Sequence, residues 1–312
     1  MRSVPLGASG VEITEFIFGA GGIGGIGSAE STRGLGLDAG QGRSRLSEAY
    51  ELGIRVVDTA DRYAGGESER VVGRWLATEK RDDVVVQTKV GLDLSAVNIG
   101  RQLARSIERL GRVDLYMSHA PDPSTPIEET LTAFAEAVHR GQIRAYGVSN
   151  VDARLLESLL AEADKRGLPR PVFVQNGFSL LDRSDERDLL PLITGAGMGY
   201  MAFSPLAGGV LSDRYLDRPA PPAGSRIALA GDLFYAGMHS PANLARVARL
   251  RDLARAHGVS TAGLALAWLR AHPVVTAPIV APSTAAQWQA VRDALSRPLD
   301  DDLFAEIGSI FD

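Results

Sequence analysis

Polar residues follow a series of apolar, β-like runs through the first two-thirds of the chain, at intervals of roughly thirty residues. They supply a carboxylate, an amine, an imidazole, hydroxyls and carboxamides, the groups that exchange protons or hydrogen-bond with small molecules. The residues are Asp58, Lys89, His119, Ser149, Asn150, Gln175 and Ser204, the last preceded by Phe203. A (β/α)8 barrel spends about 250 residues on eight strand–helix units, and the carboxyl ends of its strands meet at the rim that carries the chemistry. The spacing therefore predicts a site at one rim.

The elements that must position these residues alternate along the chain, a pattern typical of parallel βαβ units with right-handed crossovers. Strands are expected at 15–20, 54–59, 84–89, 113–119, 143–148, 172–175, 199–203 and 276–281. Helices are expected at 43–53, 67–79, 152–166, 185–196, 242–257, 260–271, 284–296 and 300–310, and a further helix is expected to end at Gly111. Another helix is expected to begin near residue 126, with Thr125 as its cap and Pro126 in its first turn. Eight strands without an internal linker predict a single α/β domain, a (β/α)8 TIM barrel over residues 1–312.

The composition excludes several classes of function. The chain has no cysteine, which excludes disulfides, thiolate metal sites and a cysteine nucleophile, and we expect no metal. A net charge of −5 with dispersed signs argues against nucleic acid as a partner. The N-terminus has no apolar segment typical of a secretory signal, and no apolar run approaches the roughly 18 residues of a membrane span. We therefore expect a cytoplasmic protein that does not act on a membrane.

Two glycine- or proline-rich segments need an interpretation. Gly19, Gly21 and Gly24 form G-x-G-x-x-G, but a dinucleotide fingerprint must open a helix directly, and the following residues have no apolar period. The better interpretation is a loop after the first strand that forms part of a pocket wall. The alternative is a low-complexity segment without a function. The second segment, 212–241, is long for an unstructured connection. It is either a functional loop on the predicted rim or a tolerated surface insertion.

The string VDTADRYAGGESERVVG (57–73) resembles the signature of the aldo-keto reductases, an Asp with a Tyr five residues later and then Gly-x-Ser-Glu. Further segments resemble that family in order: TKVG (88–91), SHAPD (118–122), GVSN (147–150), VQNGFSLL (174–181) and FSPLAGGVLS (203–212). The resemblance covers nearly the whole chain. It implies an NAD(P)-dependent oxidoreductase that transfers a hydride between nicotinamide and an aldehyde or ketone, or the corresponding alcohol or sugar.

The resemblance also implies the catalytic roles. Tyr63 is the proton donor, and because a free tyrosine has a pKa of about 10, a nearby cation from Lys89 is expected to lower that value. Asp58 holds the ammonium by a charge-assisted hydrogen bond, and His119 orients the substrate oxygen and helps to relay the proton. Each residue alone has an ordinary structural explanation, such as a strand-end cap or a core histidine. The presence of four such residues on neighbouring strands or their loops argues against that explanation for the set.

The cofactor contacts follow from the same resemblance. Ser149, Asn150 and Gln175 hydrogen-bond the nicotinamide carboxamide, and Phe203 stacks under its ring. Ser204, Pro205, Leu206 and Gly208 line the pyrophosphate path, and Ala281, Ser283 and Gln287 follow the last strand. This chain departs from the family after that strand, because residues 281–284 include no basic side chain and Ala290 and Val291 replace an acid and an amide. NADP is the expected cofactor, NAD is the alternative, and Arg292 is a candidate replacement for the missing cation.

Two other functions remain open. One is a non-catalytic NADP-binding regulatory subunit resembling the β subunits of potassium channels, against which the complete Asp-Tyr-Lys-His set argues. The other is a barrel isomerase or lyase that acts on a sugar. The residues expected to bind the nicotinamide amide, Ser149, Asn150 and Gln175, argue against it, as does the lack of an evident phosphate loop. In the favoured interpretation the partner is a small carbonyl or sugar substrate.

Overall fold

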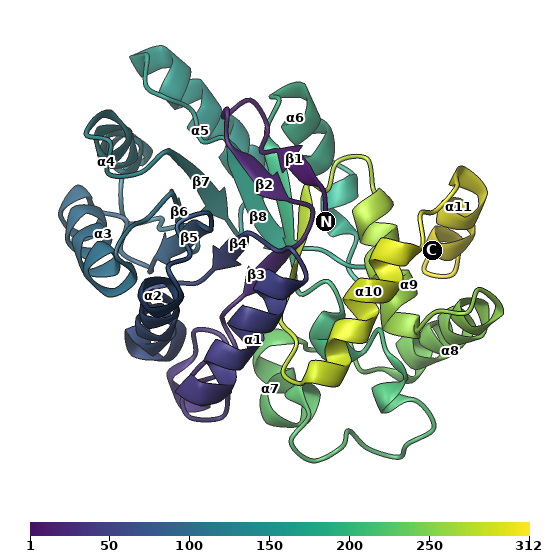
Figure 1. Cartoon of the computed structure of the whole chain (residues 1–312). Coiled ribbons are helices and arrows are strands. Elements are labelled where there is room, and N and C mark those ends of the chain that lie inside the picture. Colours follow the sequence, from purple (N-terminus) through teal and green to yellow (C-terminus); the bar gives the residue numbers. More distant parts are fainter.

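The computed structural model describes all 312 residues and contains a closed barrel of parallel strands surrounded by helices (Figure 1). Around the barrel the order is β10-β3-β4-β5-β6-β7-β8-β9. The strands are β3 (Ile17–Gly19), β4 (Val56–Asp58), β5 (Val85–Val90), β6 (Leu115–Ser118), β7 (Ala145–Ser149), β8 (Phe173–Gly177), β9 (Gly199–Phe203) and β10 (Ala277–Val280). The predicted (β/α)8 fold is confirmed.

The helices between the strands cover the outside of the barrel (Figure 1). They are α1 (Ala39–Glu51), α2 (Glu67–Glu79), α3 (Ala96–Leu110), α4 (Ile127–His139), α5 (Ala153–Arg166), α6 (Leu189–Gly195), α7 (Arg226–Phe234), α8 (Pro241–Ala256), α9 (Thr261–Ala271), α10 (Trp288–Ser296) and α11 (Asp301–Ser309). Their apolar faces and the outward side chains of the strands form the larger hydrophobic core. None of the helices combines the length and the apolar character that crossing a bilayer requires.

Local signals in the sequence placed several boundaries correctly. Asp152 caps α5 by accepting a hydrogen bond from the Leu155 amide at 2.8 Å, and α3 ends at Gly111, as expected from cap chemistry. The predicted cap of α4 was wrong, because Pro126 itself occupies the N-cap position and no side chain caps the helix.

The predicted helix over 185–196 is broken into a 3-10 turn (Ser184–Glu186) and α6. Pro191 explains the break. It lies in the first turn of α6, where a missing N–H costs nothing, whereas a helix beginning at 185 would place it in the interior. The segment 212–241 likewise contains structure that was not predicted, a 3-10 turn (Asp213–Tyr215) and α7.

An antiparallel hairpin of β1 (Ser3–Pro5) and β2 (Glu12–Thr14) plugs one end of the barrel. The Ala8 amide donates to the Gly197 carbonyl and the Arg55 amide to Thr14 Oγ1, and Gly197 and Arg55 lie just before β9 and β4. The hairpin therefore covers the amino ends of the strands. Leu6, Val11 and Ile13 join the inward side chains of the strands in the smaller core cluster inside the barrel.

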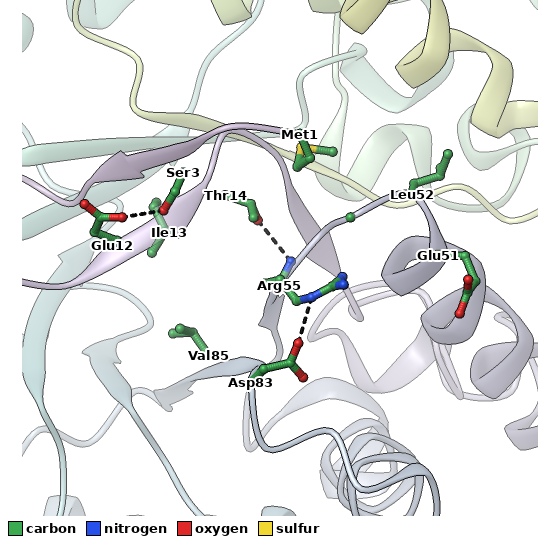
Figure 2. A pocket seen from close by; sticks show the side chains of 11 residues that line it. Met1, Ser3, Glu12, Ile13, Thr14, Glu51, Leu52, Arg55, Asp83 and Val85 are labelled. Carbon is green, nitrogen blue, oxygen red and sulfur yellow. Dashed lines mark hydrogen bonds and ion pairs between the residues drawn. The ribbon is translucent and has the colours of Figure 1, made fainter.

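A hollow beside this hairpin lies between β2, the end of α1 and the start of β5 (Figure 2). Its charged groups already have partners within the chain. Arg55 pairs with Asp83 at 2.9 Å, and Ser3 donates to Glu12 at 2.7 Å. Since the amino-terminal end of a barrel contributes to stability rather than to catalysis, the site is expected at the opposite end.

Candidate active site

A buried ion pair joins the ends of two neighbouring strands. Asp58 ends β4 and Lys89 lies near the end of β5, and both side chains are almost fully buried. Lys89 Nζ donates to both carboxylate oxygens of Asp58 at 2.7 Å and to the Thr59 carbonyl at 2.9 Å. The same nitrogen lies 3.3 Å from the Tyr63 hydroxyl. The ammonium is therefore held by an acid on one side and contacts a phenol on the other.

The turn after β4 positions Tyr63. The backbone turns sharply after this residue, since Ala64, Gly65 and Gly66 all have left-handed φ angles of 48°, 65° and 87°. A β-carbon on Gly21 would lie 3.2 Å from the Tyr63 ring, so the glycine-rich loop packs against the ring and a side chain at that position would crowd it. The loop thus fixes the phenol beside Lys89.

His119 completes the group directly after β6. Its ring meets the Tyr63 ring edge to face, with centroids 5.4 Å apart and an interplanar angle of 85°. Burial and, to a smaller extent, the charge of Lys89 lower the pKa of His119 to about 3. Its Nδ1 is buried without a hydrogen-bond partner. The imidazole is therefore neutral at physiological pH, with one nitrogen able to donate and one able to accept.

Burial reverses the expected direction of the Tyr63 pKa. Desolvation raises the pKa of the Tyr63 hydroxyl above its ordinary value of 10.0, and the nearby charge of Lys89 offsets only part of that effect. The prediction that the cation would lower this pKa below that of a free tyrosine was therefore wrong. The main physical reason is the desolvation of the buried phenolate, and Asp58, which neutralises Lys89, adds to the effect. The phenol keeps its proton at neutral pH.

Two glutamines inside the barrel hold Asp58 in place. Gln87 Nε2 and Gln175 Nε2 donate to Asp58 Oδ1 at 2.7 and 2.9 Å. Gln175 was predicted to contact the cofactor, whereas Gln87 was missed. A signal for Gln87 exists in the sequence, because residues two apart on a strand share a face, and Gln87 therefore points to the same side of β5 as Lys89. Together these amides satisfy one oxygen of a carboxylate that is buried in the barrel.

A cavity of about 980 Å³ opens at the carboxyl ends of the strands above the ion pair. Lys89 lies beneath its floor, and every other predicted site residue lines it. These residues are Asp58, Tyr63, His119, Ser149, Asn150, Gln175, Phe203, Ser204, Pro205, Leu206, Gly208, Ala281, Ser283 and Gln287. The topology thus brings together side chains that are up to 229 positions apart in the sequence, from Asp58 to Gln287.

The part of the cavity beyond β8 and β9 offers amides, an aromatic face and an unusual backbone. Asn150 Nδ2 donates to the His119 carbonyl at 2.8 Å, while the side-chain oxygen of Gln175 has no partner within the chain. The Phe203 ring lies about 3.3 Å from the position of a β-carbon on Gly177. Ser204 and Gly208 both have left-handed φ angles, of 53° and 68°, so the chain leaves β9 in a tight turn along the cavity wall.

The cations of this region were not predicted from the sequence. Arg214 and Arg226, from the segment 212–241, both line the cavity, and neither takes part in an ion pair within the chain. A β-carbon on Gly22 would lie 3.4 Å from the guanidinium of Arg226, so this side chain reaches across to the glycine-rich loop. Arg292, the candidate named from the sequence, is not among the lining residues. The segment 212–241 is therefore part of the cavity.

Gln287 has a structural role after the last strand. Its side-chain oxygen accepts hydrogen bonds from the backbone amides of Ser283 at 2.6 Å and Thr284 at 3.3 Å. This oxygen caps the turn that precedes α10, which leaves the side-chain amide nitrogen as the donor available to a ligand.

The glycine-rich segment is a wall of the cavity, as predicted. Its residues Gly21 to Ser28 and Leu35 to Leu37 contribute many of the lining positions. The next helix, α1, begins only at Ala39 and is capped by the side chain of Asp38. The geometry therefore excludes a Rossmann fingerprint, in which the glycine loop opens a helix directly.

Comparisons with known proteins agree with this arrangement. A sequence model described as "Aldo/keto reductase family" matches residues 22–312. The solved structure of a thermostable aldo-keto reductase, Tm1743, in complex with the inhibitor epalrestat superposes with a TM-score of 0.79 and 29% identity, covering 99% of this chain and 100% of that one. The chain therefore belongs to the aldo/keto reductase family, a family of oxidoreductases.

Curated relatives of the chain carry different names. A putative voltage-gated potassium channel subunit beta of Schizosaccharomyces pombe is 32% identical over 303 residues, covering 90% of this chain and 85% of the relative. An NADH-specific methylglyoxal reductase of Escherichia coli is 32% identical over 252 residues, covering 72% of this chain and 73% of the relative. Family membership therefore leaves substrate and cofactor preference to be argued from this chain's own residues.

The buried ion pair leads to a first prediction. Lys89→Met should lower the free energy of unfolding by about 3–5 kcal/mol, because it leaves Asp58 buried without its counter-charge. The double variant Asp58→Asn/Lys89→Met should recover part of that loss, since no charge is then buried. Urea unfolding followed by circular dichroism measures both. Arg140→Met, which breaks the exposed pair with Glu136, is the control and should change stability by less than about 1 kcal/mol. Equal effects of Lys89→Met and the control would contradict a functional buried pair.

Proposed function

We propose that this chain is an NAD(P)H-dependent reductase of aldehydes or ketones in which Tyr63 donates the proton. The observation that carries this proposal is the phenol of Tyr63 placed 3.3 Å from Lys89 Nζ, on the floor of a cavity that also holds His119 and an amide-binding set. When bound, the reduced nicotinamide supplies the hydride that adds to the carbonyl carbon. Tyr63 gives its proton to the carbonyl oxygen, so its own O–H bond breaks as the O–H bond of the alcohol forms. The hydride would leave the nicotinamide, which would be oxidised as the carbonyl is reduced.

The pKa values of the two residues support this division of roles. The phenol of Tyr63 carries its proton at neutral pH because burial raises its pKa, and the charge of Lys89 offsets part of the cost of releasing that proton. Lys89 then stabilises the phenolate that remains, and Asp58 keeps the ammonium in place. His119 is neutral, so it can donate a hydrogen bond that orients the substrate oxygen but has no extra proton to contribute. The relay role considered for His119 is therefore not part of the proposal.

The residues on the β8–β10 side fit a nicotinamide dinucleotide. The partner-free oxygen of Gln175, with Asn150 and Ser149, suits a carboxamide, and Phe203 offers an aromatic face. Arg214 and Arg226 are unpaired cations that suit phosphates. NADP is the proposed cofactor. NAD remains the alternative, since the name of the Escherichia coli relative specifies NADH.

A second candidate function is a regulatory subunit that binds the cofactor without turnover. The likeness to a potassium channel β subunit of Schizosaccharomyces pombe favours it. The assembled Asp58, Tyr63, Lys89 and His119 favour catalysis instead, because cofactor binding alone does not need a phenol held beside an ammonium. Turnover of any carbonyl substrate would decide between the two.

Tyr63→Phe tests the proton donor. The rate constant kcat for carbonyl reduction should fall by about 10²–10⁴-fold, because the ring is kept and the acidic proton is lost. The dissociation constant of the cofactor, measured by fluorescence titration, should stay unchanged. Tyr235→Phe is the matched control, since its hydroxyl also lines the cavity, 3.4 Å from Ser204 Oγ. Undiminished turnover in Tyr63→Phe would refute the assignment.

The pH dependence tests the protonation states. Reduction needs the neutral phenol, which is present below the raised pKa of Tyr63 and lost as the pH rises through it, so the reduction rate should fall only above about pH 10. Alcohol oxidation needs the phenolate and should rise with pH over the same range. Burial raises the pKa of Asp61 to about 6, and any transition near that pH should disappear in Asp61→Asn. A fall in reduction rate between about pH 7 and pH 9 would contradict this scheme.

The two unpaired arginines lead to a prediction about the cofactor. Arg214→Met and Arg226→Met should each weaken binding of the preferred cofactor by about tenfold or more, the loss of one charge-assisted contact. Titrations with NADPH and with NADH identify the preferred cofactor and measure the change. Arg292→Met is the control and should bind normally, because its side chain does not line the cavity. A loss of affinity in Arg292→Met alone would show that the cofactor lies elsewhere.

A further inference from the structure

The charged residues that line the cavity are unbalanced. They are Asp58, Arg62, Arg214 and Arg226. The acid is already neutralised by Lys89 at 2.7 Å, whereas the three guanidinium groups take part in no ion pair within the chain. Because arginine retains its charge at all physiological pH values, the wall presents net positive charge to a ligand. Such a cavity favours anionic groups.

Arg62 lies on a different side of the cavity mouth from the proposed phosphate path. Its side chain crosses Gly91, the residue after β5, since a β-carbon there would lie 2.9 Å from Arg62 Cδ. The phosphate path follows β9, and in the closed order β5-β6-β7-β8-β9 four steps of eight separate these strands, which is half of the ring. Arg62 therefore stands across the mouth from the turn that begins at Ser204. Its charge is not needed by the cofactor phosphates.

The guanidinium of Arg62 forms no contact ion pair, although the nearby charge of Asp61 attracts it. Asp61, its neighbour in sequence, is engaged through Oδ2 with the Gly91 amide at 3.1 Å and forms no ion pair with Arg62. Arg62 makes no side-chain hydrogen bond within the chain, and it shares the cavity wall with Tyr63, Leu92 and His119. An unpaired cation thus lies beside the residues that handle the substrate oxygen.

The mouth of the same cavity is apolar. Of the exposed large apolar side chains of the chain, all except Met1 and Val97 line it: Leu35, Leu92, Leu229, Leu233 and Phe234. They come from the glycine-rich loop, the loop after β5 and α7, so they surround the opening from several directions. Exposed apolar side chains gathered in this way mark a binding surface rather than scattered surface residues.

We propose that the substrate of this chain is an aldehyde or ketone with an apolar body and an anionic group, such as a carboxylate, that Arg62 binds. This inference rests on the proposed reductase function and names its substrate class. A guanidinium and a carboxylate form paired, parallel hydrogen bonds that fix orientation as well as distance. With its anionic end on Arg62, the carbonyl of a suitable substrate lies beside Tyr63 and His119, and its apolar body contacts Leu92.

A matched pair of substrates tests the proposal. The ratio of kcat/KM for 4-carboxybenzaldehyde to that for methyl 4-formylbenzoate compares a charged group with a neutral one of similar shape, and 3-carboxybenzaldehyde varies its distance from the carbonyl. The wild type should prefer an acid over the ester by about tenfold or more, and Arg62→Met should abolish that preference. Arg62→Lys should retain part of it. The ratio cancels any general effect of a substitution on folding or cofactor binding.

Two controls make the outcome decisive. Arg140→Met, outside the cavity, should keep the wild-type ratio. Binding of benzoate and benzamide, measured by calorimetry, reports on the anion site without turnover, and benzoate should bind the wild type at least tenfold more tightly than Arg62→Met. A substrate ratio that does not depend on residue 62, or benzoate binding unaffected by Arg62→Met, would overturn the proposal. Benzoate binding that depends on Arg62, without reduction of any aldehyde, would instead reject the reductase function and keep the anion site.

Discussion

The buried contact between Asp58 and Lys89 is the interaction on which the rest of the site depends. Two opposite charges removed from water are stable only when each has its partner and its remaining hydrogen bonds. Here the carboxylate also accepts from Gln87 and Gln175, and the ammonium also donates to the Thr59 carbonyl. Because these partners come from β4, β5 and β8, the closed barrel itself fixes the position of the ammonium. The position of the Tyr63 hydroxyl in the site is then set by its contact with the Lys89 ammonium.

Burial acts on the two uncharged members of the site in opposite directions. Burial raises the pKa of Tyr63 and lowers the pKa of His119, since in each case it disfavours the charged form. Both side chains are therefore neutral at physiological pH, and the only formal charges at the floor of the cavity are those of the ion pair. A neutral phenol and a neutral imidazole suit a reaction in which one proton is given and one hydrogen bond orients an oxygen.

The loops divide the cavity into two functional sides. The turn after β9, with Arg214 and Arg226 from the segment 212–241, forms the side proposed for the dinucleotide. The loops after β4, β5 and β6 form the other side, where Arg62 and Leu92 flank the phenol and the imidazole. Since the strands beneath these loops are fixed in one barrel, each side can differ among relatives without disturbing the other. The segment 212–241 and the glycine-rich loop are thus parts of the site rather than surface insertions.

The resemblance to the aldo-keto reductases implied Tyr63 and the cavity residues that follow β9 and β10. The sequence pattern by itself determined the barrel, the rim that carries the site and the polar residues at the strand ends. The reason is that each depends on local pattern: apolar runs at a fixed period, and a polar residue where each run ends. Only the tertiary structure decided the protonation of Tyr63, the contact of Gln87 with Asp58, and the supply of cations by Arg62, Arg214 and Arg226 instead of Arg292. These properties depend on burial and on distances between segments far apart in the chain, which no local pattern of residues encodes.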